Sequence, residues 1–162
     1  MMRTKALIGA LCLLAGMSPR LTASENKDEQ RWIDRLKATS VASLEAGLPD
    51  KPFGEWFADQ VKPATPKYEV NDCGERNGTP DERGREFPLC VTASADVPTV
   101  RRLELSFIVG SYVVPVDANA QTEEKPAKVE FMHGSLGPSD PRSKQPTRPV
   151  RKLSDVPALL HP

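Results

Sequence analysis

The chain has 162 residues, with 22 basic and 22 acidic side chains, and 38% of its residues are hydrophobic. This length fits one domain with a modest core, and the absence of a net charge argues against a nucleic-acid-binding protein.

The N-terminus has the pattern of a bacterial export signal. Arg3 and Lys5 precede an apolar run, Ala6 to Met17, and small residues follow Pro19. The run is short for a membrane-spanning helix, so we predict a signal peptide over residues 1–23 that is cleaved near Ala23. Cleavage would remove three basic residues and no acid, leaving a mature chain of formal charge −3 that is periplasmic or secreted and has no transmembrane span.

Two helices are predicted next. Apolar residues recur at helical spacing over Lys27 to Ala46, with Asn26 as the N-cap and a break near Ser40. A second, short helix follows, with Asp50 as its cap and Pro52 in its first turn. Four of its apolar residues share one side, and we expect them to pack in the core rather than on a partner: Phe53, Trp56, Phe57 and Val61.

From residue 68 the apolar period changes from helical to two, which indicates strands. The clearest strand begins at Arg102 and continues beyond Gly110 after a bulge. Hairpin-length connections favour antiparallel pairing. We therefore predict an α+β domain over residues 24–136, in which two N-terminal helices cover an antiparallel sheet of about four or five strands. Residues 137–149 are expected to form a Pro-rich loop or linker, and residues 150–162 a short strand and a closing helical turn.

The two cysteines outside the signal are expected to form a disulfide, Cys73 to Cys90, because the chain is directed to an oxidising compartment. The polar loop between them is a candidate binding loop. Its charged residues suit a partner better than a calcium ion, since three of them are arginines that would oppose a cation. The candidates are Glu75, Arg76, Asp81, Arg83 and Arg85.

The flanks of this loop, "EVNDCGE" and "FPLCV", resemble a core shared by small exported bacterial proteins that have no assigned function. The resemblance extends over about Leu48 to Val109. It implies export and supplies no mechanism.

Catalytic and metal-binding motifs are not matched. The segment His133 to Gly137 approaches the Gly-x-Ser-x-Gly nucleophile elbow, but a histidine replaces the first glycine and Pro138 prevents the helix that must follow. We expect a turn after a strand there. No zinc-ligand spacing or phosphate-binding glycine loop occurs, so no metal or cofactor is predicted.

One basic run near the C-terminus is a candidate anion-binding site, although a solvated tail that pairs with acidic residues nearby is the simpler interpretation. Its members are Arg142, Lys144, Arg148, Arg151 and Lys152.

The sequence thus favours a non-catalytic exported domain that binds an unidentified protein or envelope component. One alternative is a small cell-envelope hydrolase that works through carboxylates, with Asp72 and Glu75 as first candidates. Another is a structural envelope protein held by the basic run.

Overall fold

A five-stranded antiparallel sheet with helices packed on one face forms the protein, so the predicted α+β class is confirmed. The computed structural model describes residues 23–73, 84–98 and 101–162. Three helices come before the strands in this part of the chain and a fourth comes after them. Their order is α1 (Ala23–Ala38), α2 (Val41–Leu44), α3 (Phe53–Val61), β1 (Lys67–Asp72), β2 (Gly84–Val97), β3 (Arg101–Pro115), β4 (Glu123–Pro138), β5 (Arg148–Val150), the 3-10 turn η1 (Leu153–Asp155) and α4 (Val156–Leu160).

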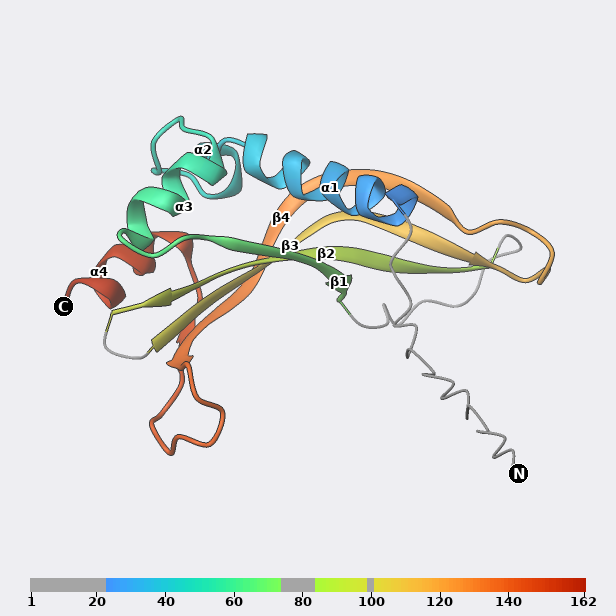
Figure 1. Ribbon diagram of the computed structural model, residues 1–162. Coiled ribbons are helices and arrows are strands. Elements are labelled where there is room, and N and C mark those ends of the chain that lie inside the picture. The colour runs from blue at the N-terminus through green and yellow to red at the C-terminus, as the bar shows by residue number, and fades with distance from the viewer. Residues whose placement is uncertain (1–22, 74–83, 99–100) are drawn as a thin grey trace, which may run out of the picture.

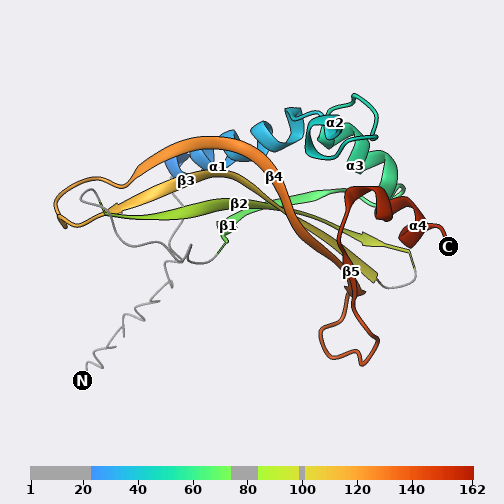
Figure 2. The same ribbon diagram turned by 180° about the vertical axis from the view of Figure 1, so that it is seen from behind.

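Each strand pairs with the next one along the chain, so the sheet order is β1-β2-β3-β4-β5. Every pair is antiparallel, as the hairpin-length connections predicted. The register shifts beside Cys90 and again around Phe107 and Ile108, and such bulges bend and twist a sheet locally. The long strands β2, β3 and β4 curve across the molecule, with α3, α4 and the β4–β5 loop at one end and the β3–β4 hairpin at the other (Figures 1 and 2).

The core lies between the sheet and the helices α1 and α3, which cover the same face (Figure 1). Alternate residues of β3 from Leu103 to Val109 are fully buried, which is the period-two pattern of a strand with one covered face. Phe53 of α3 meets Phe107 edge to face, with ring centroids 4.7 Å apart. The apolar side of α3 therefore packs in the core, as predicted.

The helical segment is divided near Ser40, as expected, although its ends differ from the prediction. Asn26 lies inside α1 and is not its N-cap. Ser40 forms an isolated bridge with Pro52, and its hydroxyl donates to the Asp50 carboxylate over 2.6 Å. Asp50 therefore fixes the turn instead of capping α3, and the N-cap of that helix is Pro52.

The predicted turn at His133 to Gly137 is wrong, because β4 continues through this segment to Pro138. Its partners are β3 on one side and β5 on the other: Gly134 pairs with Leu105 and with Val150. Pairing on both sides holds the chain extended where its composition suggested a turn.

The Pro-rich segment is a loop within the sheet and not a linker to another unit. It spans residues 139–147 and is shorter at both ends than predicted, since β4 includes Gly137 and Pro138 and β5 begins at Arg148. The predicted short strand and closing helical turn are present as β5, η1 and α4. Val150, Leu153 and Val156 are buried, so this C-terminal segment belongs to the same core.

Cys73, directly after β1, is bonded to Cys90 of β2, with Cα atoms 5.4 Å apart. The predicted disulfide is therefore confirmed. A bond that closes a loop of this length contributes about 3 kcal/mol in the chain-entropy account.

Candidate functional site

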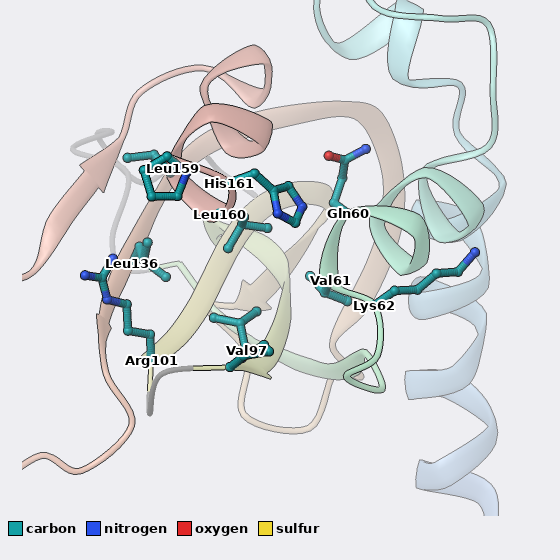
Figure 3. A pocket seen from close by; sticks show the side chains of 11 residues that line it. Gln60, Val61, Lys62, Val97, Arg101, Leu136, Leu159, Leu160 and His161 are labelled. Carbon is teal, nitrogen blue, oxygen red and sulfur yellow. The ribbon is translucent and has the colours of Figure 1, made fainter.

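A pocket of about 290 Å³ opens at the end of the sheet where α3 and α4 approach each other (Figure 3). Small-molecule sites have volumes of about 300–1,000 Å³, so this one suits a small ligand. Five apolar side chains come from four elements: Val61, Val97, Leu136, Leu159 and Leu160. The remaining lining residues are Gln60, Lys62, Pro98, Arg101, His161 and Pro162.

The apolar floor of this pocket is part of the protein core. Val61, Val97 and Leu136 are each less than a tenth exposed. Val61 reaches the pocket because α3 ends there: Lys62 turns to an extended conformation and Pro63 follows. The wall opposite α3 is the last turn of α4, which carries Leu159 and Leu160. A cavity with such walls is held in shape by core packing rather than by loops.

Two of the cationic groups on the rim differ in their pairing. The Lys62 ammonium bonds the Asp59 carboxylate over 2.6 Å, and its side chain extends away from the other lining residues (Figure 3). Asp59 also accepts a hydrogen bond from Lys51, and these two hydrogen bonds lower the pKa of its carboxyl from 3.8 to about 2. Arg101, in contrast, makes no ion pair or side-chain hydrogen bond with the residues that the structure describes.

A second, more polar pocket of about 220 Å³ adjoins the first and shares Arg101 and Leu136 with it. Its other lining residues come from the end of β4, the β4–β5 loop and the start of β5: Gly137, Pro138, Gln145, Pro146 and Arg148. Arg148 is exposed and, like Arg101, has no ion pair within the described part of the chain.

The strand register explains why Arg101 and Arg148 line the same pocket. Leu136 of β4 lies directly opposite Leu103 of β3 and opposite Arg148 of β5. Residues directly opposite one another in a sheet point to the same face, as do residues two apart in a strand. Arg101 and Arg148 therefore stand on either side of Leu136 on the face that the helices cover.

A hollow of about 430 Å³ lies beneath the β4–β5 loop, on the sheet face that points away from the helices. Its charged residues are Arg102 and Glu104, whose Nε and Oε1 atoms are 3.0 Å apart. These two charges neutralise each other, and the hollow has no apolar floor comparable to that of the first pocket. The pocket between α3 and α4 is therefore the better candidate site.

Of the five candidate residues of the predicted binding loop, the structure describes only Arg85. Glu75, Arg76, Asp81 and Arg83 lie outside the described residues. Arg85, at the start of β2, is exposed and lies opposite Val114, at the other end of the sheet from the pocket.

Only one residue of the basic run lies at either of the two pockets. Arg142 and Lys144 are exposed in the β4–β5 loop, and Arg151 and Lys152 are exposed between β5 and η1. Arg148 lines the smaller pocket, and the other four residues line neither of the two pockets. Sequence reasoning missed Arg101, His161 and Gln60, since only the three-dimensional contacts of β3, α4 and α3 bring them together.

The residues considered for catalysis are not assembled around the pocket. His133 and Ser135 lie on β4, and His133 is exposed. Asp72 is exposed at the end of β1 and is hydrogen-bonded to Tyr112. Burial and this hydrogen bond raise the pKa of the Tyr112 hydroxyl. Glu75, the other carboxylate candidate, lies outside the described residues.

Within residues 23–73, 84–98 and 101–162, no group of three or more His, Cys, Asp or Glu side chains is placed to hold a metal ion. The helices of this same part of the chain are too short or too polar to cross a membrane.

Comparison with known proteins returned no matching family model, no matching curated protein and no matching solved structure. The resemblance of the disulfide segment to exported bacterial proteins therefore stays a prediction.

Proposed function

We propose that the protein is an exported, non-catalytic binding domain that works in the periplasm or outside the cell and takes a small apolar ligand into the pocket between α3 and α4. The observation that carries this proposal is the pocket itself, an apolar cavity formed by core residues with a few polar groups at its rim. Sites for small molecules have this composition.

Two further features support the proposed compartment. The disulfide between Cys73 and Cys90 is of the kind that persists in oxidising environments. The N-terminal sequence has the charge, apolar run and small residues of an export signal.

The proposal places binding at the pocket end of the sheet, whereas the sequence pointed to the loop between the cysteines. The pocket end is built on α3, α4 and the ends of three long strands, which form a rigid scaffold. A ligand bound there could also link the domain to an envelope component, because the pocket opens to solvent beside the basic β4–β5 loop.

Binding can be tested with the neutral, apolar fluorophore N-phenylnaphthylamine, whose emission rises in an apolar environment. We expect the purified protein to enhance its emission to saturation. Leu160→Trp should abolish the enhancement because Leu160 lines the pocket and a larger ring would fill it.

The control variant is Ala158→Trp, which adds the same ring to an exposed position of the same helix. It should bind the fluorophore as the wild type does. Equal binding by the wild type and by Leu160→Trp would contradict the proposed site, and no binding by a folded wild type would contradict the proposed function.

A further inference from the structure

Two chemically different pockets share one wall at the end of the sheet. The larger has an apolar floor of valine and leucine side chains, and the smaller is lined by arginine, glutamine, glycine and proline. Leu136 and Arg101 line both, so a ligand that passes them would meet an apolar surface on one side and a cationic surface on the other.

Arg101 and Arg148, the two arginines of this junction, form no ion pair within the described part of the chain. No Asp or Glu lines either pocket in the part of the chain that the structure describes. Arg101 and Arg148 stand on the same face of the sheet, on either side of Leu136. Both line the smaller pocket, so an anion bound there would lie close to two positive charges. Arginine presents its donors in a planar fork that matches a carboxylate or a phosphate group.

We infer that the pocket binds a single-chain amphiphile with an anionic head, such as a short fatty carboxylate or an alkyl phosphate. The alkyl tail lies on Val61, Val97, Leu136 and Leu160, and the head accepts hydrogen bonds from Arg101 and Arg148. This inference rests on the proposed binding function and adds the chemical class of the ligand.

The volume of the apolar pocket and the polarity of the smaller pocket restrict the tail of the ligand to one short chain. The apolar pocket lies at the lower end of the volumes found for small-molecule sites. The smaller pocket combines the polar side chains of Gln145 and the two arginines with Gly137, two prolines and Leu136, and it is less apolar than the first pocket. The amide of Gln145 offers a neutral donor to the same head.

The inference is tested by displacement of bound N-phenylnaphthylamine from the purified, disulfide-bonded protein with octanoate, octyl phosphate and octanol. The three compounds carry unbranched tails of seven or eight carbons and differ mainly in the head. We expect each anionic compound to displace the fluorophore at a concentration at least about tenfold lower than octanol does, because only the anions add an ion pair to the hydrogen bonds that they accept from arginine. The advantage should shrink in high salt, since both arginines remain in contact with solvent.

Arg101→Gln should remove most of the preference for the anions over octanol, and its circular dichroism should match that of the wild type, which shows that the variant is folded. Arg148→Gln should reduce the preference in the same direction. The matched control is Arg151→Gln, which removes one exposed positive charge close to β5 but lines neither pocket.

The possible results separate the two proposals. Absence of fluorophore binding contradicts the binding function itself. If the fluorophore binds and octanol displaces it as well as the anions do, the binding function stands and the anionic head is wrong. An equal loss of octanoate affinity in Arg101→Gln and Arg151→Gln also overturns the inference, because it would assign the effect to overall charge. Preference for either anion over octanol supports it, and the ranking of octanoate and octyl phosphate identifies the head.

Discussion

At Gly134, β4 lies so close to β3 and β5 that a side chain would collide with them. A Cβ atom there would lie 2.6 Å from Cδ2 of Leu105, 2.7 Å from the carbonyl oxygen of Glu104 and 3.0 Å from Cβ of Val150. The Glu104 carbonyl belongs to the backbone of a paired strand and cannot move aside cheaply. Close packing against β3 and β5 therefore explains why a glycine follows His133 in this segment.

Gly134→Ala should destabilise the protein by about 1–3 kcal/mol, because an added methyl group would have to displace backbone and core atoms. Urea unfolding followed by fluorescence measures the change. Gly54→Ala is the comparison variant, since its Cβ would come no closer than 3.1 Å to another atom, Cβ of Lys37, and alanine favours the helix. Equal destabilisation by the two variants would show that the β4 position is not specially restricted.

At the scale of the element, α3 is tied at both ends by one carboxylate. Asp59 accepts hydrogen bonds from Lys51, which precedes the helix, and from Lys62, which follows it. All three side chains remain accessible to water, so the two ion pairs contribute modestly and are weakened by salt. Their pH dependence is nevertheless specific, because they lower the pKa of Asp59 from 3.8 to about 2.

A carboxyl whose pKa is lower in the folded state stabilises the fold when ionised. This contribution is fully present well above pH 3.8 and is lost as the pH falls through 3.8 toward 2. Asp59→Asn should therefore be less stable than the wild type near neutral pH and should approach it near pH 2.

Urea midpoints over this pH range, at low and high salt, would measure the difference. Glu55→Gln, on the same helix, provides the control for loss of one negative charge. A gap between wild type and Asp59→Asn that stays constant with pH would contradict the assignment.

The elements that could be predicted from the sequence are those with an uninterrupted period. Leu103 to Val109 alternate strictly, and the strand they predict is β3. Phe53, Trp56 and Phe57 repeat at helical spacing, and their burial was predicted correctly. The prediction failed at Gly134, because strand pairing on both sides outweighed the turn preference of the local composition.

The candidate site was largely hidden from the sequence because its residues are brought together only by the fold. Val61, Arg101, Leu136 and Leu160 come from four segments that are far apart along the chain. The basic run did include Arg148, but its other four residues line neither pocket. The density of positive charge in the sequence does not show which of the five lies at a pocket. The strand register identifies Arg148, because it places this residue opposite Leu136.

At the scale of the whole molecule, the packing of α1 indicates how the predicted cleavage near Ala23 would affect the fold. Cleavage near Ala23 would leave almost all of α1 in the mature chain. Residues 27–31 of α1 are exposed, and Trp32 is the first of its described side chains to be buried. Its indole nitrogen donates to Glu124 of β4 over 3.1 Å, so α1 is held to the sheet well inside the retained chain. Processing near Ala23 should therefore cost the fold little.

We expect the protein recovered from exporting cells to have the mass of a chain cleaved near Ala23. After free thiols are trapped under denaturing conditions, no cysteine should be labelled before reduction and two should be labelled after it, because Cys12 leaves with the signal and Cys73 is bonded to Cys90. Intact-mass spectrometry reads both results together. An uncleaved chain in which Cys73 and Cys90 react freely would contradict export. The pocket would then have to be tested against ligands of a reducing compartment, because its apolar floor and its arginines do not depend on the disulfide.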